Sequence, residues 1–271
     1  HFITFGRNED RKGAFSGGTE VYTLTTGLDN FLGTFQDDTF LADAQTLQSQ
    51  DLLDGKGGND KLSITLTGDI SEAVHALESK VFGIENLLVS TREYRSINFS
   101  SMSSFNNISI SSTHSEEGVT SLTTLGEGQS LGLAGIKDGG IKIVQASPIE
   151  VLDLSLDDIG ADESTREENL VIDIAGSGVG IANISIKNNN FIFLENSGGA
   201  LTTLNLTGSG NLGIQGTLAD SITTINAINS SANLILTSLT GDDTITGGSG
   251  NDSITLNGGT NNVDSGNGSD T

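Results

Sequence analysis

The sequence contains no cysteine or tryptophan, and only one proline and one methionine among 271 residues. Without cysteine no disulfide can stabilise the fold, and cysteine usage cannot indicate the cellular compartment. No apolar run approaches membrane-spanning length, so we expect no transmembrane segment. Basic residues are few: the chain has 12 of them and 35 acidic residues, which gives a formal net charge of −23. Because phosphate binding needs a basic surface, we expect no nucleic-acid partner. Bound cations would relieve the self-repulsion of such a chain.

Glycine, by contrast, is abundant, with 36 residues, and it is patterned. The segment GGSGNDSIT at 247–255 matches the nonapeptide G-G-x-G-x-D-x-U-x, where U is apolar, at every specified position. In steps of nine the Asp position falls on Asp243, Asp252, Asn261 and Asp270. Four units in register resemble the calcium-binding repeats of RTX proteins.

The chemistry of this pattern suits a hard cation. Glycine reaches the positive-φ conformations of tight turns and directs backbone carbonyls to one centre, while Asp adds a charged oxygen. Calcium takes roughly six to eight oxygens at about 2.3–2.6 Å. We expect Asp243 to face the 258–261 loop and Asp252 the 266–270 loop. The predicted Ca²⁺ ligands are Gly241, Asp243, Gly248, Gly250, Asp252, Gly259, Asn261, Gly266, Gly268 and Asp270. The alternative is that Gly and Asn only form tight turns.

Weaker copies of the unit lie near the start of the chain. The predicted ligands there are Asp29, Asp38, Gly58 and Asp60. Gln36 and Lys56 replace glycines of the pattern, and residues 42–53 are interpreted as an insert between the second and third copies. Calcium at these turns is therefore a weaker prediction than at the C-terminal repeats.

The middle of the chain repeats with a longer period. Apolar pairs two residues apart recur about every 20 residues, at Leu152/Leu154, Ile172/Ile174, Ile192/Leu194, Leu212/Ile214, Leu234/Leu236 and Ile254/Leu256. A second series, offset by half a period, runs Ile184/Ile186, Leu204/Leu206, Ile225/Ala227. Residues two apart in a strand share a face. Two strands per turn predict an all-β fold, a parallel β-solenoid or β-roll.

One segment has helical periodicity, and one acidic segment interrupts the series. Val74, Leu77 and Val81 would lie on one face of a short helix over 71–82. Residues 157–168 are interpreted as a protruding acidic loop, with calcium binding there as an alternative. The predicted regions are a junction at 1–20, an N-terminal RTX-like β region at 21–90, a β-solenoid at 91–239 and the nonapeptide β-roll at 240–271.

Catalytic motifs are missing from the sequence. His1, His75 and His114 fall in no H-E-x-x-H pattern, and no G-x-S-x-G occurs. Acidic pairs are numerous in so acidic a chain and indicate no particular site. We expect no enzymatic activity from this chain.

The N-terminal region resembles the opening of bacterial surface-layer proteins of the RTX type. The resemblance is carried by TTGLDNFLGTFQDDTFLADA, DLLDGKGGNDKL and VFGIENLLVS within residues 19–90, and the nonapeptides extend it to 240–271. Residues 1–18 have no counterpart, and the middle is similar in character only. The resemblance implies type I secretion, folding outside the cell as calcium binds, and assembly into a two-dimensional lattice.

These observations lead to a secreted, calcium-dependent structural protein at the cell surface. Its expected partners are copies of itself, in a lattice or filament, and a cell-surface polysaccharide. An adhesin stalk and the calcium-binding carrier domain of a secreted enzyme are the alternatives. The chain begins with His1 and ends at Thr271 inside a repeat. We therefore expect a processed product or a piece of a longer protein, with more repeats following.

Overall fold

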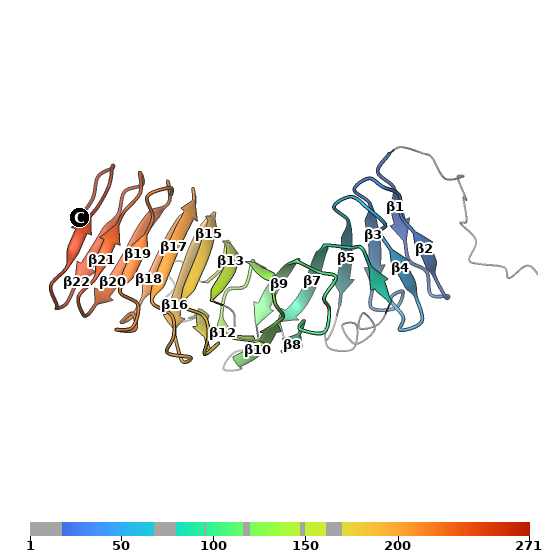
Figure 1. The fold of residues 1–271 in the computed structure, drawn as a ribbon, viewed down its shortest axis with the longest axis horizontal. Helices are drawn as coiled ribbons and strands as arrows, with labels where there is room; N and C mark the ends of the chain where they lie inside the picture. The colour runs from blue at the N-terminus through green and yellow to red at the C-terminus, as the bar shows by residue number, and fades with distance from the viewer. Residues whose placement is uncertain (1–17, 68–79, 95, 116–119, 147–149, 161–169) are drawn as a thin grey trace, which may run out of the picture.

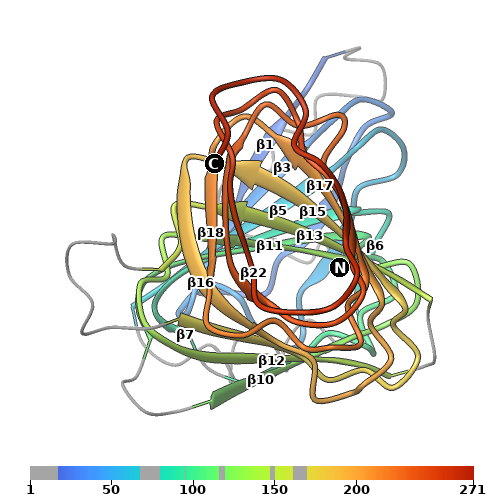
Figure 2. The same cartoon turned by 90° about the vertical axis from the view of Figure 1, so that its left-hand side faces the viewer.

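The protein folds as a stack of chain turns, each turn contributing short strands to facing sheets. The computed structural model describes residues 18–67, 80–94, 96–115, 120–146, 150–160 and 170–271. Strands lie side by side along the long axis of the molecule (Figure 1). Viewed along that axis, the C-terminal turns superpose as closed outlines (Figure 2). The strand pairs of the described residues are all parallel.

Odd-numbered strands form one sheet and even-numbered strands form the other two. Sheet A contains β1 (Val21–Thr23), β3 (Thr39–Asp43), β5 (Lys61–Leu66), β7 (Asn86–Tyr94), β9 (Asn107–Ser115), β11 (Ser130–Ala134), β13 (Val151–Asp157), β15 (Ile181–Lys187), β17 (Thr203–Gly208), β19 (Thr224–Asn226), β21 (Thr244–Thr246) and β23 (Asn262–Asp264). Sheet B contains β2 (Asn30–Leu32), β4 (Leu52–Asp54) and β6 (Val81–Phe82). Sheet C contains β8 (Ile97–Asn98), β10 (Thr120–Leu125), β12 (Gly139–Gln145), β14 (Leu170–Ile174), β16 (Asn189–Glu195), β18 (Asn211–Gln215), β20 (Asn233–Leu239) and β22 (Ser253–Leu256).

The strands alternate inward apolar and outward polar side chains, which buries one face of each sheet. In β15, Ile184 and Ile186 are fully buried, whereas their neighbours along the strand are more exposed. The parallel register places Ile184 opposite Leu206 of β17, so inward side chains of successive turns form apolar columns. One core of buried residues therefore extends along the solenoid, from Leu24 to Ile245.

This arrangement confirms the prediction of a parallel β-solenoid with two main strands per turn. The series from Ile184 to Ala227 belongs to the sheet A side, and the pairs from Ile172 to Leu256 lie in sheet C. One member was assigned to the wrong series: Leu152 and Leu154 lie in β13 of sheet A. Twelve residues, 158–169, separate β13 from β14, so that a step of 20 residues covers only half a turn there.

The predicted helix over 71–82 lies mainly outside the described residues. Only its end is described, and there the prediction was wrong: Val81 and Phe82 form β6 and pair with Leu53 and Asp54 of β4. A free sheet edge overrides helical periodicity here, because pairing satisfies the backbone groups of both strands. The described residues include no helix long and apolar enough to cross a membrane.

Candidate calcium-binding turns

The C-terminal turns stack with a separation of 18 residues, two nonapeptides. The backbone N–H of Asp243 donates to Oδ1 of Asn261 at 2.8 Å. The N–H of Asp252 likewise donates to Oδ1 of Asp270 at 2.9 Å. The Asp positions of the motif therefore form two stacks, one on each side of the roll. These are the pairs of loops that the sequence predicts to face each other.

Glycine is required where one turn covers the next. Gly259 and Gly268 have φ angles of +76° and +131°, and a Cβ on either would overlap a carbonyl oxygen of the turn beneath, that of Gly241 or Gly250. Only glycine combines this conformation with so close an approach. Gly248, Gly250 and Gly266 approach a carbonyl oxygen of the neighbouring turn in the same way, Gly266 that of Gly248, whereas a Cβ on Gly241 would meet no atom within 4 Å. Backbone oxygens are thus directed into the space between turns.

The carboxylates beside these carbonyls are buried, and that of Asp243 is incompletely satisfied. Asp243 is 4% exposed, and its Oδ2 has no hydrogen-bond partner among the described residues. Burial, followed by the nearby charges of Asp220 and Asp242, raises the pKa of Asp243. Asp252 is 1% exposed and accepts hydrogen bonds from Leu234 N at 2.9 Å and from Gly248 N at 3.3 Å.

These groups fit calcium. A buried carboxylate oxygen without a donor is costly, and a hard cation would satisfy it together with neighbouring carbonyls. The described residues include no cluster of three or more His, Cys, Asp or Glu side chains suited to a metal. The backbone must therefore supply most of the oxygens, which is what the glycine turns do.

A comparable stack occurs at the N-terminal end, before the strands of sheet A. The N–H of Asp38 donates to Oδ1 of Asp60 at 2.6 Å, and the N–H of Asp60 donates to Oε2 of Glu85 at 2.9 Å. Glu85 was not among the predicted ligands. Its signal in the sequence is Gly83, which has a φ of +56° and lies two residues before Glu85, as Gly58 lies two residues before Asp60.

Asp29 belongs to a different stack from Asp38, although both carry the same motif position. The N–H of Asp29 donates to Oδ1 of Asp51 at 3.0 Å, before the strands of sheet B. Residues 42–53 are therefore not an insert: they complete a regular turn, and Asp51 occupies the motif position. The overlooked signal is spacing, because Asp51 precedes Asp60 by nine residues, as Asp29 precedes Asp38.

The two departures from the glycine pattern are accommodated differently. Lys56 keeps the left-handed backbone of the glycine it replaces, with a φ of +71°, and its ammonium lies 2.5 Å from Oδ2 of Asp54. Gln36 does not adopt a positive φ. A Cβ on Gly58, whose φ is +115°, would lie 2.6 Å from the carbonyl oxygen of Gln36. The close stacking of the motif therefore persists at this turn.

Asp60 is the most perturbed carboxylate of the N-terminal stack. It is fully buried, and its Oδ2 has no hydrogen-bond partner among the described residues. Burial is the main cause that raises the pKa of Asp60 to about 6. The hydrogen bond from the Asp38 N–H lowers this pKa, whereas the negative charges of Asp38 and Glu85 raise it. Calcium would remove this penalty by favouring the charged form.

The raised pKa makes the stability of the calcium-free protein depend on pH. The folded state binds the Asp60 proton more tightly than the unfolded state, so the calcium-free stability of the N-terminal turns should fall as pH rises from about 4 to about 6 and then level off at its low value. Hydrogen-exchange protection of peptides from 20–66 in calcium-free buffer, corrected for the intrinsic pH dependence of exchange, measures the effect across this range. Asp60→Asn should flatten the profile, and an unchanged profile in this variant would contradict the assignment. With calcium present, protonation competes with the cation, so the stabilisation by calcium should shrink below about pH 6.

Together, the fold and these turns define a parallel β-solenoid with calcium-binding turns. Residues 238–271 match a protein-family model described as RTX calcium-binding nonapeptide repeat, in four copies. No curated protein and no solved structure matches the chain. RTX nonapeptide repeats bind calcium, which confirms the predicted cofactor for this segment, and proteins that carry them are typically secreted. The identity of the individual ligands stays a prediction.

Proposed function

We propose that this chain is a secreted structural protein that folds with calcium and assembles with copies of itself into a surface layer or sheath. The supporting observation is the outer face of sheet A, a mainly polar surface shared by twelve parallel strands, with Val21, Leu41 and Val151 exposed on it. Its side chains repeat at the strand spacing of about 4.8 Å. A repetitive subunit of this kind, with a hydrogen-bonded outer face, suits lateral packing in a regular array.

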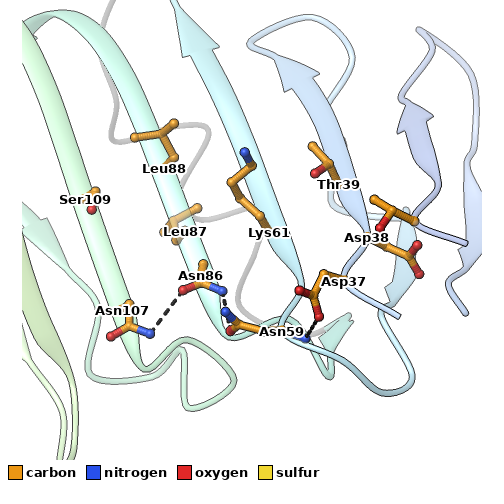
Figure 3. A pocket seen from close by; sticks show the side chains of 11 residues that line it. Asp37, Asp38, Thr39, Asn59, Lys61, Asn86, Leu87, Leu88, Asn107 and Ser109 are labelled. Carbon is orange, nitrogen blue, oxygen red and sulfur yellow. Dashed lines mark hydrogen bonds between the residues drawn. The ribbon is translucent and has the colours of Figure 1, made fainter. Parts of the chain in front are cut away.

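Side-chain ladders make this face rigid. Asn86 Nδ2 donates to Asn59 Oδ1 at 2.8 Å, and Asn107 Nδ2 donates to Asn86 Oδ1 at 3.1 Å (Figure 3). The ladder continues to Ser130, whose hydroxyl donates to Asn107 Oδ1 at 3.1 Å. Ordered side chains lose little conformational entropy when a neighbour packs on them, which favours association.

The same face contains a polar hollow that supports a second partner. A depression of about 490 Å³ is lined by Asp37, Asn59, Lys61, Asn86 and Asn107 among others (Figure 3). Amides, hydroxyls and mixed charges both donate and accept hydrogen bonds, as the hydroxyls of a polysaccharide do. We assign a cell-surface polysaccharide to this face as the alternative to a neighbouring subunit; such a ligand would fit an adhesin stalk equally well.

Assembly is tested by electron microscopy of the purified chain in millimolar calcium and in chelator. Ordered sheets or filaments should form with calcium and dissolve without it. Thr207→Lys places a charge on the outer face of β17 and should prevent assembly while the protein still folds. Ser209→Lys, in the adjoining turn, is the matched control and should assemble. Folded monomers in every condition would contradict the assembly role and favour the stalk or the carrier domain.

A further inference from the structure

The acidic stack at the N-terminal end changes chemistry partway along the solenoid. Strand register pairs Lys61 with Asn86, Asn86 with Asn107, and Asn107 with Ser130. The residues immediately before these four positions therefore follow one another in the same stack: Asp60, Glu85, Asn106 and Gln129. Carboxylates are replaced by carboxamides as the stack enters the middle of the chain.

The side-chain amide of Gln129 contacts three backbone carbonyl oxygens of one loop. Its side chain is buried, and Nε2 lies 3.1 Å from Phe99 O, 2.9 Å from Met102 O and 3.1 Å from Phe105 O. Its Oε1 accepts a hydrogen bond from Gly126 N at 2.7 Å. Three carbonyls converging on one point are what a bound cation would otherwise satisfy. Here an amide of the protein supplies the positive end of the interaction.

Asn190 makes an equivalent contact on the opposite side of the solenoid. Asn190 is paired with Leu212, and Leu212 with Leu234, whose N–H donates to Oδ1 of Asp252. Asn190 therefore stands in the stack that continues through Asp252 to Asp270. It is fully buried, and its Nδ2 donates to Lys187 O at 2.7 Å.

Further bonds of Asn190 link three successive turns. Its Oδ1 accepts from Ile159 N of the preceding turn at 3.2 Å, and its Nδ2 lies 3.3 Å from Asn211 O of the following turn. Asn190 thus has partners for both its donor and acceptor atoms. By contrast, Oδ2 of Asp60 and Oδ2 of Asp243, in the acidic turns, are buried without a hydrogen-bond partner among the described residues. The two polar side-chain atoms of Gln145, at the end of β12 and outside both stacks, are the others of this kind among the described residues.

We propose that Gln129 and Asn190 replace calcium in the middle of the solenoid, so that the turns from β8 to β18 fold without the cation while both ends require it. A carboxamide brings its own donors to the carbonyl cluster, whereas a carboxylate there needs a cation to offset its burial. This inference rests on the calcium-dependent folding proposed above. The protein then has a constitutive central block and two calcium-responsive ends.

The folded block would act as the template on which both ends form. Each acidic turn stacks on a neighbour through parallel strands, and a preformed neighbour removes the cost of nucleating a new turn. Calcium entry should therefore extend an existing solenoid outward from its centre in both directions. The calcium concentration at which the ends form should be lower than for an isolated nonapeptide segment without such a template.

Hydrogen exchange with mass spectrometry on the whole chain, in millimolar calcium and in chelator, tests the proposal. Peptides from 97–146 and 170–215 should stay protected in both conditions, whereas peptides from 20–66 and 238–271 should be protected only with calcium. Exchange of the middle as fast as the ends in chelator would overturn the inference. Full protection of the ends in chelator would instead overturn the calcium-dependent function itself.

An isosteric substitution separates the amide from ordinary packing. Gln129→Glu removes the donor and places a carboxylate among the three carbonyls, so protection of 97–134 in chelator should fall at least tenfold, and calcium should restore it. Glu127→Gln, at an exposed position of the same turn, is the matched control and should change nothing. Wild-type protection of Gln129→Glu in chelator, or a loss that calcium does not restore, would show that Gln129 does not stand in for the cation.

Discussion

Asp252→Asn is expected to raise the calcium concentration that folds residues 238–271 at least tenfold. The substitution keeps the size of the side chain and an oxygen for the bond from Leu234 N, which is 2.9 Å long. It removes the charge of a carboxylate that is only 1% exposed and lies among backbone carbonyls. A tenfold change corresponds to about 1.4 kcal/mol of binding free energy, a modest loss for one charged calcium ligand.

The measurement is a calcium titration followed by circular dichroism and by hydrogen exchange of peptides from 238–271. Asp264→Asn is the control, because it removes the same charge from an exposed residue of β23 whose carboxylate accepts a bond from Gly266 within its own turn. Equal midpoints for the two variants would show that Asp252 acts only through the net charge of the roll. The affinity of the N-terminal stack should be unchanged in both.

Gly259→Ala is expected to prevent the last turn from stacking, while Gly258→Ala, one residue earlier, is expected to be tolerated. Gly259 has a φ of +76°, and a Cβ there would overlap the carbonyl oxygen of Gly241. Left-handed backbone costs an ordinary residue about 1–2 kcal/mol, and overpacking against backbone adds about 1–3 kcal/mol. A Cβ on Gly258 would have no heavy atom within 4 Å.

Hydrogen exchange of peptides from 257–271 in millimolar calcium distinguishes these variants. Gly241→Ala separates the two causes, because Gly241 has a φ of +103° but its Cβ would meet no atom within 4 Å. Gly241→Ala should suffer only the cost of the positive φ angle, without the steric overlap. Its loss of hydrogen-exchange protection should therefore be smaller than that of Gly259→Ala. Equal protection in all three variants would mean that the turns do not stack as closely as the structure indicates.

The C-terminal roll was the most predictable part of the chain because its geometry is local. An uninterrupted repeat of nine residues makes each turn 18 residues long, so sequence spacing alone brings Asp243 to Asn261 and Asp252 to Asp270. At the N-terminal end the same motif positions lie 22 residues apart, as in Asp29 and Asp51. Because each of these turns has four more residues than two nonapeptides, a search in steps of nine from Asp29 does not reach Asp51.

Glu85 and Gln129 could not be assigned from the motif because neither is an Asp preceded by the full glycine pattern. Both stand in the acidic stack through strand register, which links residues 21–25 apart in the sequence by the hydrogen bonds of sheet A. The helix prediction was wrong at Val81 and Phe82 for a related reason. Whether a short segment becomes a strand depends on an available sheet edge, here β4.

The sequence by itself determined the calcium-binding repeats, the parallel solenoid and the alternation of inward and outward residues, because nonapeptide spacing and strand periodicity are local patterns. Only the tertiary structure decided which carboxylates stack, where Asp51 and Glu85 join them, and where amides such as Gln129 take their place. The length of the loops sets the number of residues in each turn of the solenoid. The neighbours of a residue in the stack therefore follow from the register of whole turns rather than from its own motif.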